Sequence, residues 1–494
     1  MLTRRELLIG SGALLLSPGC ARRIPTQPAG EVNDVHSQLN PTRVHAVVKP
    51  DSVETVQRVL RRARRDGRAV SIAGGRHAMG GQQFATDALL VDMTGMRRVL
   101  RFDPERGEIE VEAGIEWPEL IEYLVQTQAG QAKQWGIVQK QTGADRLTIG
   151  GSLAANAHGR GLRFKPIIQD VESFVLVDAG GDVVRCDRRT NPELFRLAIG
   201  GYGLFGVIVS VTLRLGPRRK VRRVVELVAV DRVGRAFARR IAAGFLYGDF
   251  QYSTETGSRR FLHAGVLSCY RPVPDDTPIP AGQKELQLED WRELLYLAHA
   301  DKRRAFETYS RHYLATNGQI YWSDTQQLST YIDDYHREID RRLGARDAAT
   351  EMITEIYVPR PALADFLAAV RADFRRHGVE LIYGSVRLIE RDDESFLAWA
   401  SKPWACVIFN LHIVHTAAGL EHAAAAFRRL IDLARRWGGS YYLTYHRWAT
   451  RAQVEACYPQ FSEFLRLKRV YDPEERFQSD WYRHYRSMFA VGGA

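Results

Sequence analysis

Ala73-Gly-Gly-Arg-His-Ala-Met-Gly-Gly81 is a glycine-rich loop that directly follows an apolar segment, and a second such loop reads Thr148-Ile-Gly-Gly-Ser-Leu-Ala-Ala-Asn-Ala-His-Gly-Arg-Gly161. Glycines allow backbone N–H groups to approach an anionic group closely. Two such loops in one domain therefore predict a long ligand that carries a diphosphate in its middle. His77 lies inside the first loop, within chemical reach of that ligand. A flavin dinucleotide fits this description.

The chain has 494 residues, more than the roughly 250–300 that one hydrophobic core usually serves, so we expect two domains. Apolar residues make up 45% of it and charged residues 26%, as in ordinary globular proteins. The net charge is +11, but the arginines are scattered through helical stretches such as residues 58–65, which favours solvated helix faces over nucleic-acid binding. The five cysteines are far apart and form no Cys-x-x-Cys pair, so we expect neither a disulfide framework nor a metal site.

The first 40 residues have the character of a signal and a tether. Thr3-Arg4-Arg5-Glu6-Leu7-Leu8 precedes an apolar, small-residue run from Ile9 to Leu16, an arrangement that is similar to a twin-arginine export signal. That pathway carries folded proteins, which suits a cofactor inserted before export. Cys20 could carry a lipid anchor, or the signal could simply be cleaved. We therefore expect an exported protein, either periplasmic or associated with the membrane.

Beyond the tether, short strands and helices alternate. Residues 41–217 mix both kinds of element in a way that predicts α+β structure with small sheets. Residues 218–438 combine long amphipathic stretches with strands such as 351–358 and 405–414, which predicts a second domain. Residues 439–494 form a last helical segment that we expect to return to the first domain.

Several motifs resemble the vanillyl-alcohol-oxidase superfamily, whose FAD-binding fold is called PCMH-type. They are the His77 loop, Thr148-Ile-Gly-Gly151 with Ala157-His-Gly159, Pro192-Glu-Leu-Phe195 and Gly200-Gly-Tyr-Gly203, in the family's order. The stretches Gly438-Gly-Ser-Tyr-Tyr442 and Tyr471-Asp-Pro473 with Arg476-Phe-Gln-Ser-Asp480 resemble the sugar-alcohol, aldonolactone and decaprenylphosphoryl-ribose oxidases. The resemblance implies two small α/β subdomains that bind FAD, plus an α+β substrate (cap) domain with an antiparallel sheet.

The same resemblance implies the cofactor-binding residues. In many relatives the residue at the place of His77 bonds covalently to the flavin C8 methyl group; elsewhere it only hydrogen-bonds phosphate, and we expect the covalent link. A second bond is not expected, because Arg146 and Leu147 stand where bicovalent relatives have cysteine. The imidazole of His158 either packs under the flavin or takes part in the chemistry. The implied set is Ser71, Ala73, Gly74, Gly75, Arg76, His77, Ala78, Met79, Gly80, Gly81, Gly143, Thr148, Ile149, Gly150, Gly151, Ala155, Asn156, Ala157, His158, Val207, Ile208 and Tyr442.

Oxidation of an alcohol by a flavin needs a hydride acceptor, a group that takes the hydroxyl proton and a positive group near the reduced flavin. Glu355 and Arg387 stand where the sugar-oxidising relatives place an acidic and a basic residue, and both alternate with apolar neighbours. They line the site if they face inward; otherwise they form a solvent-facing pair.

Further along the chain, His412, which alternates with Asn410, faces the flavin or is an ordinary buried histidine. Several relatives carry a lysine where this chain has Tyr445, so Tyr445 or His446 could accept the proton instead.

The resulting prediction is an FAD-dependent oxidoreductase that transfers a hydride from a CH–OH group of a polyol, sugar or aldonolactone to flavin N5. Molecular oxygen or another acceptor then reoxidises the flavin. A lipid-linked sugar or an aromatic or amine substrate is the alternative, and a cap pocket dominated by aromatic, uncharged residues would favour it. A flavin-binding module without turnover is a further alternative.

Overall fold

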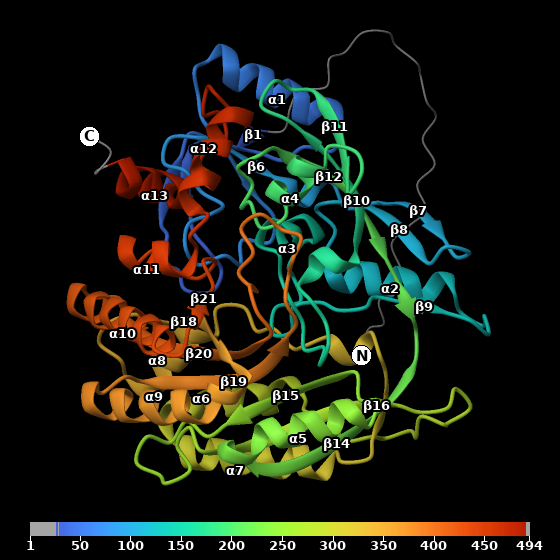
Figure 1. The fold of residues 1–494 in the computed structure, drawn as a ribbon, viewed down its shortest axis with the longest axis vertical. Helices are drawn as coiled ribbons and strands as arrows, with labels where there is room; N and C mark the ends of the chain where they lie inside the picture. The colour runs from blue at the N-terminus through green and yellow to red at the C-terminus, as the bar shows by residue number, and fades with distance from the viewer. Residues whose placement is uncertain (1–25, 28, 491–494) are drawn as a thin grey trace.

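The structure is a computed structural model that describes residues 26–27 and 29–490. The twin-arginine-like segment and Cys20 lie outside these residues, so export and lipid anchoring stay predictions. Figure 1 shows an upper part built from the blue and teal first half and the red C-terminal helices, above a large sheet drawn in green to orange. None of the described helices is both long and apolar enough to cross a membrane.

The first part of the chain folds around a four-stranded sheet with the order β1-β4-β6-β5. Helix α1 (Val53–Arg65) begins at Ser52, whose hydroxyl accepts a hydrogen bond from the Thr55 N–H, and its apolar side packs in the same core as three of these strands. Strand β5 runs parallel to β6 and leads directly into the first glycine loop. The strands are β1 (Thr26–Gln27), β4 (Ala46–Val48), β5 (Val70–Ala73) and β6 (Leu89–Asp92), and β2 (Gly30–Val32) pairs separately with β3 (Thr42–Val44).

A five-stranded antiparallel sheet with the order β11-β10-β12-β8-β7 forms the second subdomain. A hairpin joins β7 (Val99–Asp103) to β8 (Glu108–Glu112). The other strands are β10 (Val171–Val177), β11 (Val183–Asp187) and β12 (Val207–Arg214). The helices are α2 (Trp117–Thr127), α3 (Ile149–Ala155) and α4 (Pro192–Ala198). Separately, β9 (Trp135–Gly136) pairs with β13 (Gly216–Pro217).

The cap is built on an eight-stranded antiparallel sheet with the order β17-β14-β16-β15-β19-β20-β18-β21. Helices α5, α9 and α10 pack as one layer on it, while α6, α7 and α8 form another group. The strands are β14 (Lys220–Ala229), β15 (Tyr247–Tyr252), β16 (Ala264–Pro272), β17 (Ile320–Trp322), β18 (Ala349–Pro359), β19 (Leu381–Ile389), β20 (Trp404–Val414) and β21 (Ser440–Tyr441). The helices are α5 (Val230–Ala242), α6 (Leu288–Ala300), α7 (Lys302–Ala315), α8 (Tyr335–Leu343), α9 (Leu363–His377) and α10 (Ala417–Arg435).

These sheets confirm the predicted α+β class with small sheets and an antiparallel cap sheet. The domain limits at residues 40, 217 and 438 stay a prediction. After α10 the chain runs through α11 (Arg451–Cys457), α12 (Phe461–Tyr471) and α13 (Asp480–Ala490), which lie beside the blue N-terminal elements in Figure 1. The return is a backbone contact, because the Val70 N–H donates to the Arg476 carbonyl at 2.7 Å and the Gln478 N–H donates to the Val70 carbonyl at 2.9 Å.

A buried ion pair holds the turn that makes this contact. The Lys468 Nζ donates to the Asp472 carboxylate at 2.6 Å, and both side chains are almost fully buried. The same carboxylate accepts from the backbone N–H groups of Arg476 at 2.8 Å and Phe477 at 2.7 Å. Asp472 therefore fixes the strand-like segment that pairs with β5 just before the first glycine loop.

We expect Asp472→Ala to lower the free energy of unfolding by about 3–5 kcal/mol, because it leaves Lys468 buried and unpaired. Urea unfolding followed by far-ultraviolet circular dichroism measures this loss. The control is Asp432→Ala, which removes an exposed partner of Arg435 and should change stability by less than about 0.5 kcal/mol. Equal stability of the two variants would contradict the role given to Asp472.

Candidate functional site

A cavity of about 840 Å³ lies between the two glycine loops and the cap sheet. Its size falls at the upper end of the range for small-molecule sites, which is roughly 300–1,000 Å³. Of the predicted cofactor residues, the following line it: Ala73, Gly74, Gly75, Arg76, His77, Ala78, Met79, Gly143, Thr148, Gly150, Gly151, Ala155, Ala157, Ile208 and Tyr442.

The two glycine loops are pressed against each other. A Cβ atom on Gly74 would lie 2.1 Å from the Thr148 Oγ1, and one on Gly75 would lie 2.1 Å from the Arg146 carbonyl oxygen. No side chain fits at either place, so the contact itself requires glycine. A Cβ on Gly143 would meet no atom within 4 Å, which agrees with its place on the cavity wall.

The first loop has the donors that a diphosphate needs. Among the described residues, no protein group accepts a hydrogen bond from the backbone N–H groups of residues 75–79. Buried N–H groups without partners are costly, whereas a run of them is a ready anion-binding surface. The loop therefore fits the diphosphate of FAD.

Some predicted cofactor residues support the loops from behind and do not line the cavity. The Asn156 side chain donates to the Asp392 carboxylate at 2.8 Å, which ties the end of α3 to the cap. Thr148 lines the cavity and also supports the loop, because its Oγ1 accepts from the Gly151 N–H at 3.1 Å and so starts α3. The members of the set that do not line the cavity are Ser71, Gly80, Gly81, Ile149, Asn156, His158 and Val207.

His77 lies on the cavity wall next to a second histidine. Its Nδ1 is 2.9 Å from the Nε2 of His36, and Tyr331 meets its ring edge-on at 5.8 Å between centroids. Burial, followed by the nearby His36, holds the pKa of His77 well below its ordinary value of 6.5. The imidazole is therefore neutral at pH 7, with one protonated and one unprotonated nitrogen.

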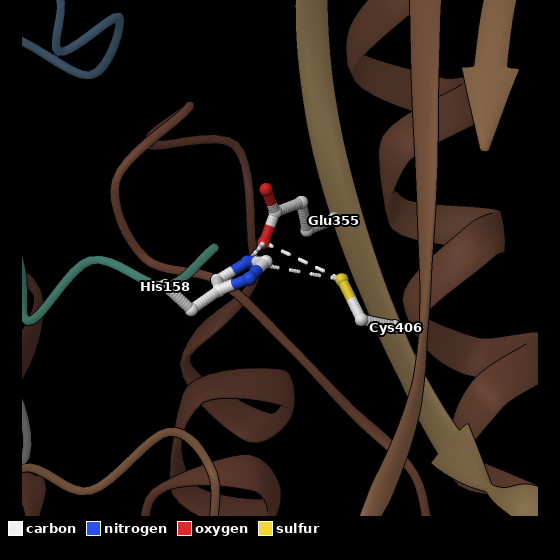
Figure 2. Close-up of side chains that lie close together, drawn as sticks. All are labelled: His158, Glu355 and Cys406. Atoms are coloured by element: carbon white, nitrogen blue, oxygen red, sulfur yellow. Dashed lines mark hydrogen bonds and ion pairs between the residues drawn. The ribbon is translucent and has the colours of Figure 1, made fainter. Parts of the chain in front are cut away.

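Glu355, His158 and Cys406 point toward one another in the core, from the second glycine loop and from strands β18 and β20 (Figure 2). The His158 Nε2 is 2.8 Å from the Glu355 Oε2, and both side chains are fully buried. The Tyr357 hydroxyl donates to the same oxygen at 3.0 Å, and the Tyr445 hydroxyl donates to Oε1 at 2.9 Å. Glu355 thus lies at the centre of a hydrogen-bond network that reaches the cavity.

The hydrogen bonds fix where the protons lie. The His158 Nδ1 contacts the Gly159 carbonyl at 2.9 Å, and a carbonyl only accepts, so Nδ1 carries a hydrogen. Burial alone would raise the pKa of Glu355, but the charge and hydrogen bond of His158, together with Arg387 and Tyr445, lower it to about 2. Glu355 is therefore a carboxylate, held by the His158 ring and by two tyrosine hydroxyls.

Arg387 brings unused donors to the cavity. The register pairs Arg387 with Cys406 and Ser385 with Ile408, and Ile408 also pairs with Glu355, so Arg387 and Glu355 share one face of the sheet. The Nε and Nη1 of Arg387 are buried without a partner among the described residues, as is the Oδ1 of Asn410. Arg387, Glu355 and Asn410 all line the cavity, so its polar end offers a guanidinium, a carboxylate and an amide oxygen.

Two predicted catalytic histidines lie elsewhere. His412 is on the Glu355 face, but its Nδ1 is 3.4 Å from Glu351, which also binds His299 at 2.6 Å, and none of these three lines the cavity. His446 contacts Thr354, the neighbour of Glu355 that points to the opposite face of β18. Of the two proton acceptors considered at this place, only Tyr445 reaches the cavity.

The fold combines the cavity between the glycine loops with a separate antiparallel cap sheet, as in an FAD-linked oxidoreductase. Residues 44–187 match the FAD binding domain family, so this part of the chain is an FAD binding domain.

Comparison with known proteins relates the chain to aldonolactone oxidases and dehydrogenases. It is 25% identical to L-gulono-1,4-lactone dehydrogenase of Mycobacterium tuberculosis over 448 residues, which are 89% of this chain and 95% of the relative. It is 32% identical to L-gulonolactone oxidase of Bos taurus over 171 residues, 34% of this chain and 37% of that protein. It is 28% identical to L-galactono-1,4-lactone dehydrogenase 2 of Oryza sativa over 46% of this chain and 40% of the relative.

Sequence reasoning missed several residues of the cavity wall. His36 comes from a segment assigned to the tether, so no motif pointed to it. Asp249, Gln251 and Tyr383 come from strands β15 and β19, where polar residues alternate with apolar ones. This alternation is the signal by which the sequence could have pointed to these three residues.

We expect His446 to control part of the pH dependence of stability. Burial lowers its pKa to about 3 from the ordinary 6.5, and its Nδ1 accepts from the Trp448 N–H at 3.3 Å. Between about pH 3 and pH 6.5 the unfolded chain therefore binds a proton at this histidine, whereas the folded protein does not. Above about pH 6.5 this group does not lower the free energy of unfolding. Below that pH the free energy of unfolding falls by roughly 1.4 kcal/mol per pH unit, until pH 3.

His446→Gln should flatten the fall in unfolding free energy between pH 6 and pH 4, as measured by urea titrations. His263→Gln removes an exposed histidine and should leave the slope as it is. An unchanged slope in His446→Gln would contradict the neutral state of the buried ring.

Proposed function

We propose that this protein oxidises a CH–OH group of an aldonolactone or a related sugar or polyol with bound FAD. The observation that carries the proposal is the buried network of His158, Glu355 and Tyr445 beside the unpartnered donors of Arg387. This network opens onto the same cavity as the N–H groups of the first glycine loop. The chain's similarity to lactone dehydrogenases over most of its length supports the choice of substrate class.

The residues at hand would divide the work as follows. FAD, when bound, supplies the hydride acceptor. Glu355, the carboxylate at the centre of the network, would accept a hydrogen bond from the substrate hydroxyl and so orient and polarise that hydroxyl as it loses its proton. His158 and Tyr445 hold that carboxylate in place through their hydrogen bonds.

Arg387 would stabilise negative charge at the polar end. Its Nε–H and Nη1–H have no protein acceptor among the described residues, so they are free for an oxygen of the substrate or for the charge that develops on reduction. Tyr442 would contact the ring system from the side of α3, since its hydroxyl donates to the Ala155 carbonyl at 2.5 Å.

We also propose that FAD is joined covalently to His77. The neutral imidazole on the cavity wall, with His36 at one nitrogen, supports this link, and phosphate binding is the alternative. Reoxidation by oxygen or by another acceptor is left open by the small residues Ala155 and Ala157 on the wall.

Anaerobic mixing tests the function. L-gulono-1,4-lactone, L-galactono-1,4-lactone or a polyol such as xylitol should bleach the visible flavin band, and Glu355→Gln should slow the bleaching by roughly 100-fold or more. The control is Glu351→Gln, a buried change on the same face of the same strand that does not line the cavity. Bound flavin that no lactone, sugar or polyol reduces would contradict the proposal.

For the covalent link, we expect the yellow colour of the natural protein to stay with an acid-precipitated pellet. The His77→Ala variant should still bind FAD before precipitation, but all of its yellow colour should pass to the supernatant after acid treatment. His263→Ala, an exposed change, should behave like the natural protein. Colour released from the natural protein would show non-covalent binding.

A further inference from the structure

The cavity has a second arm, away from the glycine loops, under helices α6 and α7. On α6 the wall is formed by Trp291, Leu294, Leu295 and Ala298, which follow one another at helical spacing. On α7 it is formed by Ala305, Phe306, Tyr309 and Tyr313, again along one face.

These helices leave their apolar stripes partly uncovered. An amphipathic helix normally buries such a stripe against the core. In α6, Leu297 is the one buried residue, whereas Trp291, Leu294 and Ala298 stay half-buried along the cavity. The protein itself therefore does not complete the burial of these side chains.

Most charged groups of the arm already have partners. The Arg160 Nη1 pairs with Asp249 at 3.5 Å and its Nη2 donates to the Gln326 carbonyl at 2.6 Å, while its buried Nε has no partner among the described residues. The Nε and Nη2 of Arg223 donate to the Tyr270 hydroxyl and its Nη1 donates to Thr316, while its guanidinium stacks on Tyr321 at 4.6 Å. Its donors are in use. Lys284 and Glu285, which also line the arm, are exposed and of opposite charge.

We propose that this arm binds an apolar group, alkyl or aromatic, carried by the alcohol substrate at a distance from the oxidised carbon. The inference rests on the proposed function, because the arm is continuous with the polar end at Glu355 and Arg387. The substrate class then becomes a sugar-like alcohol with an apolar substituent, and not a free lactone or polyol alone.

The test compares n-hexyl and methyl β-D-glucopyranoside as probes for the flavin-loaded protein, by isothermal titration calorimetry below the micelle concentration. The hexyl compound should bind at least roughly ten-fold tighter, because it places additional methylene groups in the arm. Ala298→Phe and Ala305→Phe should abolish the difference by filling the arm. Ala300→Phe is the matched control, since Ala300 ends the same helix but is exposed and does not line the cavity.

Equal affinity of the two probes, or no binding of either, would overturn the proposal. So would a hexyl preference that both filling variants retain, because binding would then occur elsewhere. Retained flavin absorbance shows that the variants are folded. If lactones and polyols fail to reduce the flavin while the hexyl preference persists and Ala298→Phe removes it, the arm stands and the substrate choice above fails.

Discussion

The structure depends on the burial of one carboxylate. Glu355 is fully buried, and a buried charge is tolerated only when opposite charge and hydrogen bonds surround it. Its partners come from different parts of the chain: His158 from the second glycine loop, Tyr357 from the cap sheet and Tyr445 from the C-terminal segment. Satisfying this one group therefore aligns the cofactor domain, the cap and the returning chain around the same cavity.

The glycine loops impose a second constraint of a different kind. The approach of Gly74 to Thr148 and of Gly75 to the Arg146 carbonyl leaves no room for side chains, so the loops are set by steric contact and not only by their affinity for an anion. The pairing of Val70 with the segment held by Asp472 fixes the strand that feeds the first loop. A cofactor binding here would meet a rigid surface.

The sequence was informative where chemistry and spacing coincide, and less so where tertiary contacts decide. The glycine loops, the α+β class and the shared face of Glu355 and Arg387 follow from motif order and from two-residue alternation. The location of His446 does not, because it depends on which side of β18 the chain returns to after β21. The sequence does not reveal that α6 lines the apolar arm. The spacing of Trp291, Leu294 and Ala298 is the same whether the helix faces a core or a cavity.

The cavity also shows how one residue type serves two purposes through its surroundings. His77 is buried beside another imidazole, which disfavours protonation and leaves a neutral ring. His158 is buried between a carboxylate and a carbonyl, with one ring nitrogen 2.8 Å from Glu355 and the other 2.9 Å from the Gly159 carbonyl. A ring on the cavity wall can contact a ligand directly, whereas a ring behind the wall acts through the group that it holds. Of these two histidines, His77 is therefore the one placed to contact a bound ligand, and His158 is the one that positions the Glu355 carboxylate.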